Sequence, residues 1–158
     1  MNDTARPRFI SSADRPGTGI EFLRGILAGE YANLPIGEHL GFRVASVDKG
    51  KVTIVGRPDE HSLNYLNSVH GGWTAAILDT AMALSSLSLL DADQTFTTLD
   101  IRINYLRAIT LETGEVRAEG RVIQGGRKVA YCEANLLDGA GKLFAHGTGT
   151  CLILPRER

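Results

Sequence analysis

The main feature of the hydrophobic pattern is a long stretch from Trp73 to Leu90 that is apolar almost all the way round. A helix with such a pattern has no polar stripe and is expected to be buried. Gly71 and Gly72 precede it, and residue types common in turns and helix caps stand just before the glycines. The pattern therefore predicts one long buried helix that begins at the glycine pair.

Short β-type runs surround this helix in the sequence. They are 41–47, 51–55, 97–105, 116–122, 129–137 and 143–154. Turn residues separate the first two runs and also the last four, which is typical of antiparallel strands. We expect an α+β fold in which a curved antiparallel β-sheet wraps around one long central helix.

The run at 97–105 alternates between apolar and polar residues, so its side chains are expected on two opposite faces. Ile101 and Ile103 fall on one face, whereas Thr98 and Asp100 fall on the other, polar face. This places Thr98 away from the apolar side of the strand.

The start of the chain is polar and contains prolines and a glycine, which predicts a flexible N-terminal arm over 1–18. Apolar residues then recur at helical spacing from Ile20 to Leu27, and 34–37 resembles a connection. The length of 158 residues suits one domain with a real core, so 19–158 is expected to form a single domain.

Composition excludes several function classes. The 17 basic and 18 acidic residues give a net charge of −1, which provides no case for nucleic-acid or anionic-membrane partners. Cys132 and Cys151 lie far apart in apolar runs and are expected to be free, buried thiols. No secretory signal pattern is present, and the polar residues within the central helix argue against a membrane span. We expect a cytoplasmic protein.

One charged residue, Asp79, interrupts the apolar helix. A buried carboxylate is costly unless it is paired, neutralised or used chemically. Asp79 is therefore either a structural carboxylate, for example one paired with an arginine, or a general base or nucleophile in a site of low polarity.

The glycine pair either forms a simple turn or has a functional role. The first N–H groups of a helix have no partner within the helix, so those at Gly71 and Gly72 are suited to polarise a carbonyl oxygen. Asp79 follows Gly71 by eight residues, or about 12 Å along one helix. One substrate carbon cannot readily touch both, so we expect a homodimer in which each subunit supplies one of them.

Other candidates stand near the glycines and beyond. His70 is either a general base or a residue that orients the loop, and Asn64 either shapes that loop or holds water or substrate. No other histidine stands at ligand spacing, so no metal is expected. Arg127 and Lys128 are either a solvated strand end or contacts for phosphates. Phosphate-loop and serine-hydrolase motifs are absent from the sequence.

The loop and helix carry a resemblance to a known family. Residues 64–72 read N-Y-L-N-S-V-H-G-G, and an Asp follows the first glycine of the pair by eight residues. The strand T-T-L-D-I-R-I-N-Y-L-R-A and the closing hairpin from Gly125 add to the likeness, which covers about 19–154. This pattern resembles the hotdog-fold acyl-CoA thioesterases, specifically the phenylacetate-degradation (PaaI-type) branch.

The resemblance implies a role for each candidate. Asp79 would be the base or nucleophile of thioester hydrolysis, and the Gly71 N–H of the neighbouring subunit would polarise the carbonyl, with Gly72 beside the substrate. Asn64 would position water or substrate, His70 would orient the loop, and Thr98 would help to hold the nucleophilic water.

Two departures from the family pattern are visible. Asn67 replaces a usual glycine, and asparagine tolerates the left-handed backbone that a glycine would supply. Ala83 stands where relatives with a helix Glu carry a hydroxyl, so that variant arrangement does not carry over.

The implied substrate is an acyl-CoA with an aryl or short- to medium-chain acyl group, held in part by Arg127 and Lys128. No cofactor is implied, because coenzyme A is part of the substrate, and a dimer of dimers is expected. Two alternatives remain. One is a hydratase or dehydratase on the same fold that uses His70 with Asp79. The other is a non-catalytic acyl-CoA-binding protein.

Overall fold

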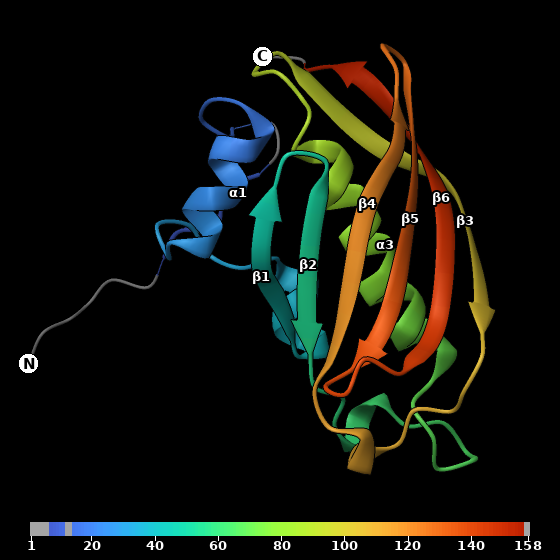
Figure 1. Ribbon diagram of the computed structural model, residues 1–158. Coiled ribbons are helices and arrows are strands. Elements are labelled where there is room, and N and C mark those ends of the chain that lie inside the picture. The colour runs from blue at the N-terminus through green and yellow to red at the C-terminus, as the bar shows by residue number, and fades with distance from the viewer. Residues whose placement is uncertain (1–6, 12–13, 157–158) are drawn as a thin grey trace, which may run out of the picture.

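The computed structural model describes residues 7–11 and 14–156. Six antiparallel strands form one sheet in the order β1-β2-β4-β5-β6-β3. Their bounds are β1 Phe42–Asp48, β2 Lys51–Gly56, β3 Gln94–Tyr105, β4 Val116–Gly125, β5 Val129–Asp138 and β6 Leu143–Pro155. The sheet curves around the long helix α3, Gly71–Leu87, which lies along its concave side (Figure 1). The expected α+β hotdog fold is confirmed.

Helix α3 packs closely on the sheet because small residues meet at the contact. A Cβ atom on Gly120 of β4 would lie only 2.3 Å from the Ala81 carbonyl oxygen of α3. Ser85 is fully buried, and its hydroxyl donates to Ala81 O at 2.7 Å and accepts from Val52 N at 3.0 Å. The serines in this apolar helix therefore satisfy their own hydrogen bonds, which allows them to be buried.

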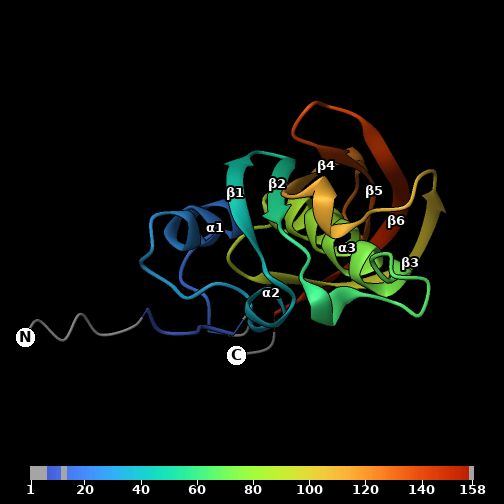
Figure 2. The ribbon, with the colours of Figure 1, turned by 90° about the horizontal axis from the view of Figure 1, so that it is seen from below.

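Two short helices stand at the β1 edge of the sheet (Figure 2). Helix α1, Gly19–Leu27, matches the expected amphipathic helix and begins with a capping box between Thr18 and Glu21. Helix α2, Pro35–Leu40, occupies the stretch predicted as a connection, so that prediction is wrong. Its N-terminal proline and the left-handed Gly41 at its end are ordinary helix boundaries. Single-turn 3-10 helices at Glu60–Ser62 and Leu111–Thr113 complete the chain.

The expected flexible arm lies in part outside the described residues. Its described part is largely exposed but is attached to the domain at two points. Arg15 is 1% exposed, and its Nη2 donates to the carbonyl oxygens of Asp91 and Gln94 at 2.7 Å each. A backbone bridge joins Arg8 to Tyr31. Polar composition did not reveal this, because Arg15 is held by backbone carbonyls far away in the sequence.

Strand β3 has a bulge between Thr98 and Asp100, where Leu99 is an extra residue relative to β6. A bulge shifts the alternation of side chains by one position. Thr98 and Ile101 therefore both face α3, and Asp100 faces outward and is exposed. The predicted placement of Thr98 on the polar face is wrong for this reason.

Cys132 and Cys151 are both free and buried on the helix side of the sheet. Within the described part of the chain, no helix has the length and apolarity needed to cross a membrane.

Candidate active site

Asp79 is half-buried in the middle of α3 and is held by the strand beside it. The Thr98 hydroxyl donates to Asp79 Oδ1 at 3.0 Å. Burial raises the pKa of Asp79 above its usual range, and the hydrogen bond from Thr98 opposes this with a smaller effect. Among the described residues no lysine or arginine forms an ion pair with Asp79. These features fit a carboxylate kept basic and unpaired better than a structural ion pair.

The N-terminus of α3 presents one free amide. His70 is the N-cap residue, and its Nδ1 accepts a hydrogen bond from the Gly72 N–H at 2.8 Å. The Gly72 amide is thus already used, and His70 orders the helix start. The Gly71 N–H finds no acceptor among the described residues. It is the amide that a bound carbonyl oxygen can use.

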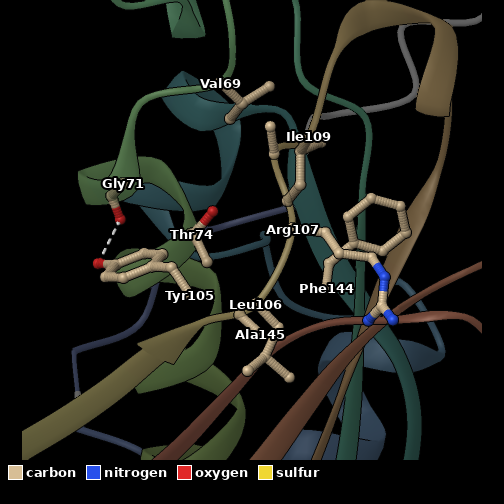
Figure 3. A pocket seen from close by; sticks show the side chains of 10 residues that line it. Val69, Gly71, Thr74, Tyr105, Leu106, Arg107, Ile109, Phe144 and Ala145 are labelled. Atoms are coloured by element: carbon tan, nitrogen blue, oxygen red, sulfur yellow. Dashed lines mark hydrogen bonds between the residues drawn. The ribbon is translucent and has the colours of Figure 1, made fainter.

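A cavity of about 350 Å³ opens beside Gly71 (Figure 3). Most of its walls are apolar, and Thr74 and Arg107 add polar groups. Tyr105 forms one wall and donates its hydroxyl hydrogen to Gly71 O at 3.0 Å. A Cβ on Gly71 would lie 3.3 Å from the Tyr105 ring, so glycine suits this position. Sequence reasoning did not assign Tyr105 or Arg107 to the site, and their only signal was that Tyr105 ends the 97–105 run and Arg107 follows it by two residues.

The loop before the helix is organised by Asn64. Its Oδ1 accepts from the backbone N–H of Leu66 at 2.8 Å and of Ser68 at 3.3 Å, and its Nδ2 donates to the Ser68 hydroxyl at 3.1 Å. Asn67 adopts a φ of +57°, the left-handed conformation expected when asparagine replaces glycine. Within one chain, the Asn64 amide therefore shapes the loop that leads to Gly71.

Arg127 and Lys128 lie far from the glycines in the same chain. They occupy the turn between β4 and β5, at the top of Figure 1, whereas α3 begins near the bottom. Both are exposed and line an open cavity with Asp93 and Gln94. They lie at the end of the sheet where β3 begins.

Asp79 and Gly71 are also separated. Both belong to the regular helix α3, and eight residues correspond to about 12 Å along its axis. One chain thus carries two halves of a site: a carboxylate with its threonine, and a free amide beside a cavity. No group of metal-binding side chains is found within the described part of the chain.

Comparison with known proteins agrees with this arrangement. The family model of the thioesterase superfamily matches residues 66–145, half of the chain. A conserved protein of Pseudomonas aeruginosa has a similar structure, with 32% identity, a TM-score of 0.72, and coverage of 77% of this chain and 94% of that one. A mutant of the phenylacetic acid degradation protein PaaI from Thermus thermophilus shows 28% identity, a TM-score of 0.69, and coverage of 75% and 98%.

A curated relative is 1,4-dihydroxy-2-naphthoyl-CoA hydrolase of Listeria monocytogenes, which is 24% identical over 121 residues, 77% of this chain and 97% of that protein. The family match includes Gly71, Asp79 and Thr98. The chain belongs to the thioesterase superfamily and is a thioester hydrolase of the PaaI-like hotdog type.

Proposed function

We propose that the protein is an acyl-CoA thioesterase that releases a free acid and coenzyme A from an acyl-CoA. The observation that carries the proposal is Asp79, a half-buried carboxylate that burial makes more basic and that Thr98, but no described cation, contacts. A protein that only binds gains nothing from such a group. The Listeria relative, named as a CoA hydrolase, supports the choice of thioester.

The proposed reaction needs only water, one side chain and one backbone amide of the protein. Asp79 removes a proton from water, the water oxygen attacks the thioester carbon, and the Gly71 N–H stabilises the oxyanion. The C–S bond then breaks, and the departing sulfur takes up the proton. In the alternative route Asp79 attacks directly, and water opens the resulting anhydride with the same products. Neither route calls for a metal or cofactor, because coenzyme A is part of the substrate.

Two subunits are needed to bring the halves of the site together. Strand β3 is a sheet edge, and Leu99, Ile101 and Tyr105 on it are exposed large apolar or aromatic side chains. Such an edge favours pairing with a second strand. If a second subunit pairs its β3 antiparallel with β3 of the first, the two strands run in opposite directions. The Tyr105 end of one strand, with Gly71 beside it, then lies next to the Thr98 end of the other. We propose this homodimer, and a dimer of dimers as the full assembly.

The same arrangement gives the cationic residues a role. Arg127 and Lys128 lie at the end of the sheet where β3 begins, so the partner's α3 start would approach them in the dimer. They are our proposed contacts for the phosphates of coenzyme A. Arg107, which lines the cavity beside Gly71, is a third cation proposed to contact the bound nucleotide. We propose the cytoplasm, where acyl-CoA occurs, as the site of action.

Thiol release from a panel of acyl-CoAs tests the function. The panel runs from acetyl- to palmitoyl-CoA and includes phenylacetyl- and benzoyl-CoA. Asp79→Asn is expected to lower turnover at least about a hundredfold, the typical scale for a lost general base. Asp48→Asn, at the exposed last residue of β1, is the matched control.

The outcomes separate the alternatives. Turnover that survives in Asp79→Asn contradicts the assigned base. Hydration of an enoyl-CoA without thiol release indicates a hydratase. Tight binding of acyl-CoA with neither reaction indicates a binding protein.

A further inference from the structure

A second cavity, of about 220 Å³, lies between the N-terminal part of the chain and α3. Its walls are mostly apolar side chains from the segment before α1, from α1 and from α3: Phe9, Ile10, Phe22, Ile26, Leu84 and Leu87. It is separate from the cavity beside Gly71, with which it shares no lining residue.

This cavity begins close to the reacting carboxylate. Phe96 lines it and precedes Thr98 by two residues on the same face of β3, a separation of about 7 Å. Leu84 lines it too and lies about 7.5 Å along the α3 axis from Asp79, on a face turned by about 140° from it, so Phe96 marks the nearer end of the cavity. Ala83, one turn after Asp79, has no side chain beyond Cβ to close the path between them.

We propose that this cavity holds the far end of a linear, unsubstituted acyl chain of about eight to twelve carbons whose thioester lies at Asp79. The inference rests on the proposed function and names its substrate class. The size follows from reach and volume. A gap of about 7 Å takes five or six bonds of an extended chain, at about 1.2 Å per bond. An apolar cavity of about 150 Å³ holds six-carbon benzene, so 220 Å³ admits a similar or slightly longer segment.

The apolar lining also determines which acyl groups the cavity excludes. An acetyl group is too short to reach the cavity. A charged or hydroxylated end would lose its hydration against apolar walls without regaining hydrogen bonds. Because Phe9, Ile10, Phe22 and Ile26 all precede the part of the chain that matches the family, the N-terminal segment and α1 are the specificity-determining elements.

The test fills the cavity and compares short with long substrates. Ala32 lines the cavity, and Ala32→Phe places a ring in it. Ala28→Phe, at the exposed C-cap of α1, makes the same change outside it. In the unsubstituted protein, kcat/KM is expected to rise about fourfold for each added methylene that the cavity buries. Ala32→Phe should lower kcat/KM at least about tenfold for decanoyl-CoA, with butyryl-CoA little changed and Ala28→Phe without effect.

A second variant and a binding measurement keep the test decisive. Ile10→Ala enlarges the cavity and should move the optimum to a longer chain, even if Ala32→Phe fails to fold. Calorimetric affinities for butyryl- and decanoyl-CoA are measured in Asp79→Asn, where turnover does not interfere. An affinity that increases with chain length, and no longer does so in Ala32→Phe, supports the assignment of the cavity to the acyl chain. This holds even if no thiol is released, in which case only the proposed function fails. Turnover with no dependence of kcat/KM or affinity on chain length, or equal losses for both substrates, overturns the cavity assignment alone.

Discussion

The assignment of the Gly71 amide as the oxyanion donor can be tested by removing that single N–H. Gly71 is the first residue of α3, where proline is well tolerated because the N–H has no partner within the helix. His70 has φ −62° and ψ 136°, the extended conformation that a residue before proline adopts. Gly71→Pro is therefore expected to fold and to lack only the proposed donor.

The expected loss of kcat follows from the proposed role of the Gly71 amide as the oxyanion donor. Loss of one oxyanion-hole donor lowers kcat by about 100- to 1000-fold, or about 2.7–4 kcal/mol. The assay is steady-state thiol release with the best acyl-CoA of the panel. Gly71→Ala is the matched control, because it adds a Cβ near the Tyr105 ring at 3.3 Å but keeps the N–H. A loss in Gly71→Ala as large as in Gly71→Pro would show that space, not the amide, matters, and would refute the assignment.

The same variant tests whether two subunits share a site. When Gly71→Pro and Asp79→Asn chains are mixed, each mixed dimer carries one intact site and one doubly altered site. Random exchange in equal amounts should restore about a quarter of the unsubstituted activity. No recovery on mixing, with subunit exchange shown independently, would mean that both groups act within one chain.

Three further changes have expected outcomes. Thr98→Val removes the hydroxyl that lowers the pKa of Asp79, so the acid limb of the pH–rate profile should move to higher pH. At pH values below this limb, activity should fall about tenfold. Thr98→Ser should restore both the position of the acid limb and the activity. Burial raises the pKa of Asp79, so the ionised form weakens folding. Asp79→Asn should therefore increase the free energy of unfolding at pH 8 by about 0.5–1 kcal/mol, and urea titrations should show this gain shrinking as the pH falls through the pKa of Asp79. Gly120→Ala should destabilise the protein by about 2–3 kcal/mol in thermal unfolding, because its Cβ would lie 2.3 Å from Ala81 O, whereas Gly139→Ala, with open space around it, should be neutral.

The parts of the fold that depend on local patterns were predictable from the sequence. The all-round apolar helix and the alternating strands appear with ends within a few residues of their expected positions. The position of Arg15 was not predictable, because it depends on the backbone carbonyls of Asp91 and Gln94, far away in the sequence. The helical turn from Pro35 was missed because a six-residue helix carries little periodicity.

The candidate site was predictable where chemistry contrasts with its surroundings. Asp79 was visible as a charge in an apolar helix, and Gly71 as a glycine at a helix start. Which of the two glycine amides is free depends on the His70 ring, whose Nδ1 accepts from Gly72. Tyr105 was not singled out, because an aromatic residue at the end of a strand is usual and nothing local indicates that it contacts Gly71.

The bulge in β3 also bears on how this chain tolerates insertions and deletions. Leu99 is 55% exposed, so many side chains would fit there as far as the single chain is concerned. Its deletion should also be tolerated, because without the extra residue the strand would alternate regularly from Gln94 to Tyr105 and Thr98 and Tyr105 would still face the same side. The damaging change is to straighten the bulge with Leu99 retained, because Thr98 and Tyr105 would then lie on opposite faces and either Asp79 or Gly71 would lose its neighbour. Position 99 can therefore be looped out or absent, but it cannot join the regular pairing with β6.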